Sequence, residues 1–230
     1  MLLKNWSELP PFMQNKSILE YFNVLNNKKF SLIVKRLFDI FFSLILLILL
    51  LPINIIISIL IKMDSKGPIL FTQRRVTQYG KVFKIFKFRT MVYNAESLGA
   101  QVTSDSDSRI TNCGKWLRKF RIDEFPQLIN VLLGQMSFVG VRPEVEKYVD
   151  RYSEEMLATL LLPAGITSPA SIAFKNEDKL ISQSQNTDDF YVNNILPDKM
   201  KINLEYIRNF SFIYDIKIMI LTVLAVIKKH

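Results

Sequence analysis

The chain has 230 residues, a length that suits one domain with attachments or one large domain. Its formal net charge of +9 indicates phosphate-bearing partners, namely nucleic acid, anionic lipid or a phosphorylated substrate. The single cysteine, Cys113, excludes a disulfide framework and favours a reducing, cytosol-facing compartment. The single histidine, His230, is the last residue and a poor candidate for a metal ligand or a base.

An apolar segment, Leu37–Ile61, follows an N-terminal extension of residues 1–34 in which no pattern predicts catalysis. A hydrophobic content of 49% and a mean hydropathy of +0.17 favour membrane association without indicating a polytopic bundle. The segment is long enough to cross a hydrocarbon core of roughly 30 Å as a helix. It therefore predicts a membrane anchor.

Pro52 interrupts this anchor. A helix must bend or break there, because proline lacks an N–H and its ring clashes with the carbonyl four residues earlier. Basic residues flank both ends, with Lys35 and Arg36 before the segment and Lys62 and Lys66 after it, so the positive charge assigns neither end to one side of a membrane. The pattern alone leaves two alternatives equally open: a single-pass helix kinked at the proline, and a re-entrant segment that leaves on the face it entered.

A β-hairpin is predicted after the anchor, with strands at Pro68–Phe71 and Val82–Phe88 and a turn at Tyr79-Gly80. Basic residues without any acidic residue run through this region: Arg74, Arg75, Lys81, Lys84, Lys87 and Arg89. Three interpretations of this basic stretch compete, namely a solvated face, a patch that meets anionic lipid, and a nucleic-acid surface with interleaved aromatic residues.

The pattern then predicts three helices and a strand that frame the centre of the chain. A basic helix spans Gly114–Arg121, and a second helix runs from Pro126 to about Leu133, with Gly134 as its stop. A short strand begins at Met136 and ends in Arg-Pro, and a helix is expected over Glu144–Leu161.

The last third of the chain is predicted to hold a polar loop at residues 175–189 and a helix at Phe212–Ile227. The helix is too short to span a bilayer comfortably. An amphipathic helix at the membrane interface is the favoured interpretation, and a helix packed on the core is the alternative.

Asp123 and Glu124 are adjacent carboxylates between the basic helix and the start of the next helix. A helix dipole favours negative charge at that end, so Asp123 is expected to stay ionised. An ionised carboxylate can attack phosphorus or hold Mg²⁺. An N-terminal cap paired with Arg118 or Arg121 is the simpler explanation of a lone Asp-Glu pair.

Several motifs occur in a fixed order after the proline-interrupted anchor. They are Phe-Thr-Gln-Arg, Phe-Lys-Phe-Arg-Thr-Met, Arg-Ile-Asp-Glu-Phe-Pro-Gln-Leu-Ile-Asn-Val-Leu and Met-Ser-Phe-Val-Gly-Val-Arg-Pro-Glu. In this order and spacing the chain closely resembles the bacterial sugar transferases, the monotopic polyprenyl-phosphate phosphoglycosyl transferases. The resemblance covers about Lys35 to Lys228.

The resemblance implies an enzyme that transfers a sugar-1-phosphate from a UDP-sugar to polyprenyl (undecaprenyl) phosphate and releases UMP. Such a reaction starts cell-surface glycan assembly at the cytoplasmic face of the bacterial inner membrane. By analogy, Asp123 attacks the sugar-bearing phosphate and carries the phosphosugar covalently. Glu124 would orient the metal or accept a proton from the polyprenyl phosphate, and Mg²⁺ would bind at Asp123.

Further site residues follow from the same analogy. Arg142 of the Val-Arg-Pro motif is expected to contact phosphate, and Arg89 matches a basic position near the site. Lys175 and Glu177 are expected near the nucleotide-sugar. Two more bases, Arg118 and Arg121, are predicted to stabilise phosphate charge because phosphoryl transfer needs positioned cations.

The implied fold is α+β and mostly helical. It consists of the N-terminal extension (1–34), a re-entrant helix-break-helix membrane anchor (35–62) broken at Pro52, and a cytosol-facing transferase domain (63–230) with a short β-hairpin and amphipathic interfacial helices. The expected partners are the UDP-sugar, the polyprenyl phosphate and the lipid bilayer, and not nucleic acid. A homo-oligomer is left open.

Two alternatives remain beside this interpretation. One is a basic membrane-surface adaptor that binds anionic lipid or nucleic acid through residues 74–89; the intact Asp-Glu and Arg-Pro motifs argue against it. The other is a family member with altered activity, because the sequence departs from the family pattern at several positions. The departures are Leu51, Gln135, Val141 and the stretch 168–177.

Overall fold

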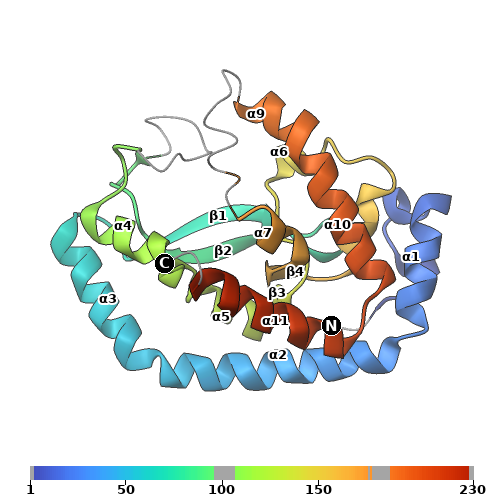
Figure 1. Cartoon of the computed structure of the whole chain (residues 1–230), viewed down its shortest axis with the longest axis horizontal. Helices are drawn as coiled ribbons and strands as arrows, with labels where there is room; N and C mark the ends of the chain where they lie inside the picture. Colours follow the sequence, from blue (N-terminus) through green and yellow to red (C-terminus); the bar gives the residue numbers. More distant parts are fainter. Residues whose placement is uncertain (1–2, 96–106, 176, 178–186, 228–230) are drawn as a thin grey trace.

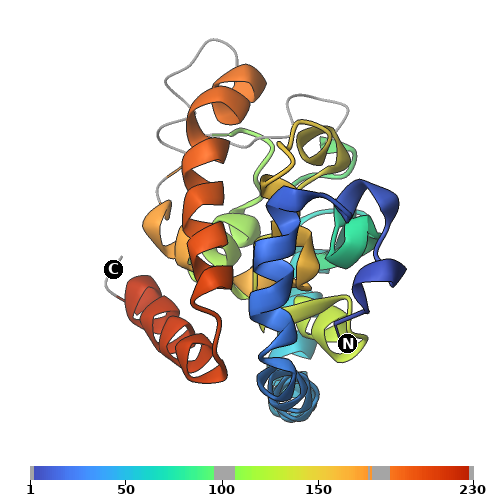
Figure 2. The ribbon, with the colours of Figure 1, turned by 90° about the vertical axis from the view of Figure 1, so that its right-hand side faces the viewer.

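The computed structural model describes residues 3–95, 107–175, 177 and 187–227, and the fold within them is mostly helical. Two long helices, α2 (Lys29–Leu49) and α3 (Leu51–Asp64), form the lower and left edges of the molecule in Figure 1. The remaining helices and two small sheets lie on one side of this pair (Figures 1 and 2). The predicted α+β, mostly helical composition is confirmed.

The break between α2 and α3 lies at Leu50, and Pro52 occupies the first turn of α3, where a missing N–H is tolerated. In the described part of the chain no single helix is long and apolar enough to cross a membrane. The two helices together meet the length and composition of a broken span or re-entrant loop, and they are bent by 60°. The predicted break near the proline is therefore confirmed.

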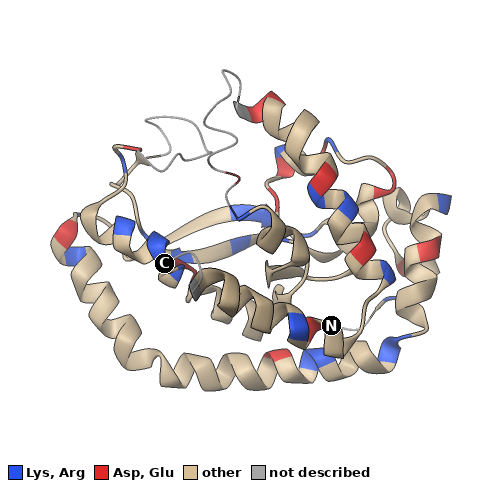
Figure 3. Ribbon diagram, viewed as in Figure 1, with Lys and Arg blue, Asp and Glu red and all other residues tan. Residues whose placement is uncertain are grey.

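One face of α2 is polar and buried, because Lys35, Asp39 and Ser43 recur every four residues and point into the protein. Lys35 Nζ donates to Asp215 Oδ2 at 2.6 Å and to the Val139 carbonyl at 2.7 Å. The other faces of the pair are apolar and exposed, and Figure 3 shows few charges along them. Their exposed members include Leu37, Phe41, Leu44, Ile48, Leu49, Leu51, Ile53, Ile55, Ile56, Ile59 and Met63.

The N-terminal extension packs into the largest hydrophobic core. It consists of two short 3-10 turns, η1 (Trp6–Glu8) and η2 (Pro11–Met13), and helix α1 (Lys16–Asn26), which lies beside α10 (Leu196–Arg208). Met13, Ile18 and Leu25 are fully buried there together with Tyr206 and Phe210.

An antiparallel hairpin is formed by β1 (Leu70–Val76) and β2 (Val82–Phe88), with the turn η3 (Gln78–Gly80) between them. The second strand and the turn were predicted correctly. The first predicted strand, Pro68–Phe71, was too short and started too early. All seven residues of β1 pair with β2, so the strand continues through Arg74 and Arg75. A strand tolerates such basic residues because alternate side chains point to solvent.

A second, parallel pair joins β3 (Met136–Val139) to β4 (Ala164–Thr167). The helix predicted over Glu144–Leu161 is wrong. The segment holds only α6 (Glu146–Val149) and the 3-10 turn η6 (Met156–Leu161). The Ser153 hydroxyl accepts from the Met156 N–H at 3.3 Å, and such local side-chain bonding competes with helix continuation.

The remaining elements complete the layer above the anchor in Figure 1. The predicted helix at Phe212–Ile227 is confirmed as α11, which packs on α2 and β3. The predicted loop at 175–189 lies largely outside the described residues, although its last three residues begin α9. The other helices here are α7 (Pro169–Ala173), α9 (Thr187–Phe190), the π-helical turn η7 (Tyr191–Ile195) and α10.

Candidate active site

The backbone around Asp123 turns sharply between two helices. Helix α4 (Asn112–Lys119) begins with a Thr111 hydroxyl cap on the Gly114 N–H, and α5 (Gln127–Leu132) begins after Pro126. Between them, Arg121 has a left-handed φ of 57° and is followed by the 3-10 turn η5 (Ile122–Glu124). The reversal at Arg121 directs the two carboxylates inward, and each of the two residues is only 8% exposed.

The Glu124 carboxylate is surrounded by cations. Its Oε1 accepts from Arg142 Nη2 at 2.7 Å and from Lys87 Nζ at 3.0 Å, and Arg121 Nη1 lies 3.8 Å away. The three bases come from the segment after β3, from β2 and from the turn before η5. Glu124 therefore joins three separate parts of the chain at one oxygen.

Asp123 has a different environment. Its Oδ1 is buried and has no hydrogen-bond partner among the described residues. Burial raises the pKa of Asp123 above its ordinary value, and the negative charge of Glu124 raises it further, while Lys87, Arg121 and Arg118 oppose the shift. A buried carboxylate oxygen with no protein partner is available to a ligand, a metal ion or a reacting atom.

The pKa of Glu124 moves in the opposite direction. Burial by itself would raise it, but Arg142, Lys87 and Arg121 together hold the pKa well below its usual range. Burial also lowers the pKa of Lys87, which its contact with Glu124 partly restores. The two adjacent acids thus differ: Glu124 is a fixed negative charge, whereas Asp123 is the carboxylate whose charge is easier to change.

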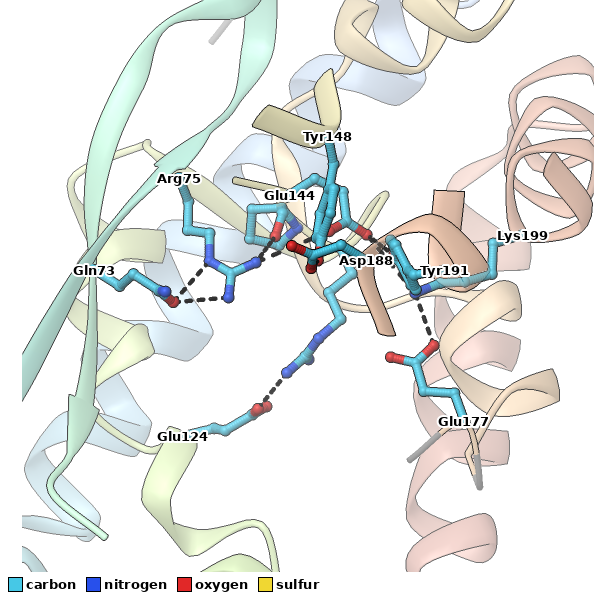
Figure 4. A network of polar contacts seen from close by, with 11 residues as sticks. Gln73, Arg75, Glu124, Glu144, Tyr148, Glu177, Asp188, Tyr191 and Lys199 are labelled. Atoms are coloured by element: carbon cyan, nitrogen blue, oxygen red, sulfur yellow. Dashed lines mark hydrogen bonds and ion pairs between the residues drawn. The ribbon is translucent and has the colours of Figure 1, made fainter. Parts of the chain in front are cut away.

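A second polar network lies beyond Arg142, and Figure 4 shows it next to Glu124. Tyr191 donates to Glu144 Oε1 at 2.5 Å, and the buried Lys199 Nζ donates to the Tyr191 hydroxyl at 3.0 Å and to Glu177 Oε2 at 2.9 Å. Glu144 directly follows the Arg142-Pro143 pair in the sequence. The network therefore fixes the backbone position from which the Arg142 side chain reaches Glu124.

The comparisons with known proteins agree on one family. The sequence model of the bacterial sugar transferases matches residues 30–229. The chain is 35% identical over 197 residues to the UDP-N-acetylgalactosamine-undecaprenyl-phosphate N-acetylgalactosaminephosphotransferase of Aeromonas hydrophila, covering 84% of this chain and 44% of that protein. It is 33% identical over 211 residues to the exopolysaccharide production protein PSS of Rhizobium leguminosarum bv. phaseoli, covering 85% of this chain and 96% of that protein.

This chain belongs to the bacterial sugar transferase family. The predicted resemblance is thereby confirmed. A third relative, the undecaprenyl-phosphate glucose phosphotransferase of Komagataeibacter xylinus, is 36% identical over 202 residues, or 85% of this chain and 36% of that protein. The chain spans less than half the length of two of these three relatives.

In this bacterial sugar transferase the predicted site residues fall into two groups. Asp123, Glu124, Arg142 and Arg121 lie together, and Arg118 is near enough to influence the charge of Asp123. Glu177 lies in the neighbouring network. The phosphate-binding and nucleotide-binding roles assigned to these residues stay predictions.

No hydrogen bond or ion pair found among the described residues joins Lys175 or Arg89 to Asp123 or Glu124. The Lys175 side chain is exposed. The Arg89 guanidinium is buried, and it donates to backbone carbonyls at the end of α3. Its role as a phosphate ligand stays a prediction.

Sequence reasoning missed Lys87, Glu144, Tyr191 and Lys199 as members of the site. Lys87 belongs to the basic stretch between residues 74 and 89. It lies two residues before Arg89, a predicted site residue, and this spacing on a strand could have indicated that both side chains point to the same face. Lys199 lies on α10, a helix that the pattern did not predict, so nothing in the sequence placed it beside Glu144.

Proposed function

We propose that this chain transfers a sugar-1-phosphate from a UDP-sugar to polyprenyl phosphate through a covalent intermediate on Asp123. The observation that best supports this proposal is the buried Asp123 Oδ1, which has no hydrogen-bond partner among the described residues. The adjacent residue, Glu124, is paired with the cations Lys87 and Arg142. Family membership supports the proposal, and so do the names of two of the three relatives, which include undecaprenyl phosphate and in one case a UDP-sugar.

The reaction has two displacements at one phosphorus. In the first, an Asp123 carboxylate oxygen forms a bond to the sugar-bearing phosphorus, the phosphoanhydride bond breaks, and UMP leaves with the bridging oxygen. In the second, a phosphate oxygen of the polyprenyl phosphate attacks the same phosphorus, and the bond to Asp123 breaks. The products are UMP and a polyprenyl-diphosphate sugar, and the carboxylate is regenerated.

The cations around the two acids provide the electrostatic part of this mechanism. Negative charge is spread over the phosphoryl oxygens as the bonds change, and positioned bases stabilise it. Arg142, Arg121 and Arg118 are the proposed phosphate contacts. Because the pKa of Glu124 is held low, this residue is a weak base, and holding Lys87 and Arg142 at the site is its better-supported role.

Mg²⁺ fits this site in one respect. The buried Asp123 Oδ1 is available, and Mg²⁺ commonly binds one or two carboxylates together with substrate phosphates. Among the described residues no group of three or more His, Cys, Asp or Glu side chains is placed to hold a metal ion, so the donor diphosphate would have to supply further ligands. When bound, the ion would neutralise charge on that diphosphate.

The donor is proposed to extend from Arg142 towards Glu177 and Lys175. The negative charge of Glu177, like that of Glu124, raises the pKa of Arg142, which supports a donor site that extends from this arginine to Glu177. Glu177 is fixed by Lys199 and is an acceptor for donor hydroxyl groups. Lys175 would add positive charge near the nucleotide.

The bent α2–α3 pair is the proposed re-entrant anchor in the inner membrane of a bacterium, with the rest of the chain on the cytoplasmic face. Exposed apolar side chains cover the outer faces of both helices, and the helices bend by 60° at the break. The polyprenyl acceptor lies in the bilayer, so a shallow anchor would hold Asp123 near the lipid headgroups.

Covalent labelling tests this proposal. The purified chain in nanodiscs is mixed with a panel of UDP-sugars, and UMP release and the mass of the peptide containing Asp123 are measured. Asp123→Asn should abolish both signals, while Asp198→Asn, which changes an exposed aspartate on α10, should leave them unchanged. Turnover in Asp123→Asn would contradict the assignment of the nucleophile.

A further inference from the structure

The buried Arg89 guanidinium contacts the end of the anchor helix α3, where the Asp64 carboxylate also accepts from the Cys113 N–H at 2.9 Å. Arg89 Nη1 donates to the Lys66 carbonyl at 2.9 Å, and Nη2 donates to the Ser65 carbonyl and hydroxyl at 2.6 and 2.9 Å. A longer contact of 3.4 Å joins Nη2 to the Ile61 carbonyl in the last turn of α3. Ser65 is the C-cap residue of α3 and Lys66 follows it, so the guanidinium places positive charge at the C-terminal end of the helix, where the helix dipole favours it.

The backbone at Gly67 passes so close to this guanidinium that a side chain would not fit there. Gly67 has a φ of +124°, a conformation that L side chains rarely adopt, and a Cβ at this position would lie 2.1 Å from Arg89 Nη1. Arg89 itself is only 5% exposed. A planar fork of donors suits several carbonyls at once, which a compact lysine ammonium does not reproduce.

The same strand connects this guanidinium to the two acids. Arg89 directly follows β2, and its N–H donates to the Ile69 carbonyl at 2.9 Å, which continues the hairpin pairing. Lys87 lies two residues earlier, so both side chains leave the strand on one face, roughly 7 Å apart along it. Lys87 holds Glu124 at 3.0 Å while Arg89 holds the end of α3.

We propose that Arg89 is a positioning residue that fixes the depth of Asp123 and Glu124 relative to the membrane anchor. The inference rests on the proposed function, and it gives the arginine no contact with the substrate. One link between the anchor and the acids runs from α3 through the guanidinium to β2, and from Lys87 to Glu124, beside the apolar packing of α3 on β2 and α4. Loss of the guanidinium contact would leave the acids intact but allow the domain to move relative to α3.

Two acceptors separate this role from phosphate binding. In Arg89→Lys, the KM for a long-chain polyprenyl phosphate in nanodiscs should rise roughly tenfold, the factor produced by losing one or two charge-assisted hydrogen bonds. With a short-chain, detergent-soluble acceptor, kcat and both KM values should stay within about twofold of the wild-type values, since a soluble acceptor reaches the acids at any depth. Arg74→Lys, an exposed arginine on β1, is the matched control and should behave as wild type with both acceptors.

Gly67→Ala tests the same contact from the other side, because it displaces the guanidinium and keeps the arginine. It should reproduce the acceptor-dependent defect. A raised KM for the UDP-sugar with both acceptors, in either variant, would overturn the proposal in favour of a phosphate contact. Unchanged kinetics with the long-chain acceptor would overturn it as well.

A depth measurement needs no turnover and separates this inference from the proposed function. A spin label is attached through Lys84→Cys on the exposed face of β2 in a Cys113→Ala background, and its depth is measured with lipid-soluble and water-soluble relaxants. Arg89→Lys should change or broaden the depth of the label, and an unchanged depth would overturn the inference. A wild-type chain that releases no UMP with either acceptor would overturn the proposed function, while the label would still decide the role of Arg89.

Discussion

Arg142 and Glu124 form a hydrogen-bonded ion pair in which Nη2 lies 2.7 Å from Oε1, and the glutamate is almost fully buried. The pair joins the segment after β3 to the turn before α5. Since Lys87 donates to the same oxygen, Glu124 determines where two cations stand relative to Asp123.

If Asp123 is the nucleophile, as proposed, the loss of covalent labelling at low pH should follow the protonation of this carboxylate. The pKa of Asp123 is raised above 3.8, chiefly by burial, so the ionised nucleophile is lost at a higher pH than for an ordinary aspartate. Glu124→Gln removes the neighbouring negative charge and should move the acid limb of covalent labelling to lower pH. The rate of labelling as a function of pH is the measurement. A limb that stays in place or moves upward would contradict the assignment.

Lys87 and Arg142 should act as a coupled pair of charges. Replacing either by methionine removes a cation near the reacting phosphate and should lower kcat roughly 10²- to 10³-fold. The double variant should lose less than the product of the two single losses, because both act through Glu124. Lys84→Met, on the exposed face of the same strand, is the control and should keep the wild-type kcat. Independent, multiplicative losses would contradict the coupling.

Glu177 should discriminate among donor hydroxyl groups. Glu177→Gln keeps the size of the side chain but weakens the acceptor, so the KM for the UDP-sugar should rise roughly tenfold or more, with a smaller change in kcat. Deoxy donors should lose affinity with the wild type and little further affinity with the variant, and the sensitive position identifies ribose or the transferred sugar. Glu146→Gln, which breaks the exposed pair with Arg74, is the control. Equal losses for every deoxy donor in both proteins would rule out a direct contact.

The buried ion pair between α2 and α11 should be sensitive to loss of one partner. Lys35→Met leaves Asp215 with its Tyr206 hydrogen bond but without its cation, and it should lower the free energy of unfolding by about 3–5 kcal/mol. Adding Asp215→Leu should recover part of this loss. Denaturant unfolding in detergent micelles measures both. Lys201→Met, at an exposed pair on α10, should change stability by less than about 0.5 kcal/mol.

The N-terminal extension should contribute to the stability of the transferase region. Met13 is fully buried in the largest core, so Met13→Ala should cost about 2–5 kcal/mol. Leu19→Ala on the exposed side of α1 is the control and should cost far less. A neutral Met13→Ala would mean that residues 3–28 fold apart from the rest of the chain.

The sequence allowed prediction of the features that depend on local chemistry. Pro52 predicted the break, Gly134 the end of α5, and the aromatic and β-branched content of Val82–Phe88 the second hairpin strand. The proximity of Lys199 to Glu144 could not be predicted, because it depends on how α10 packs. The buried stripe on α2 was equally hidden. Lys35 was interpreted as a base that flanks the apolar segment and Asp39 as an interruption of it, because their partners in β3 and α11 cannot be recognised from the sequence.

The pairing of Lys35 with Asp215 also has a consequence for biosynthesis. The two residues are separated by 180 positions, so at 5–20 residues per second the ribosome needs roughly 10–40 s to make the partner after the lysine emerges. Under the proposed topology, α2 and α3 reach the bilayer long before α11 exists. The polar stripe of α2 must then wait in contact with water or lipid headgroups, which favours a shallow initial insertion and makes docking of the last helix the step that completes the enzyme.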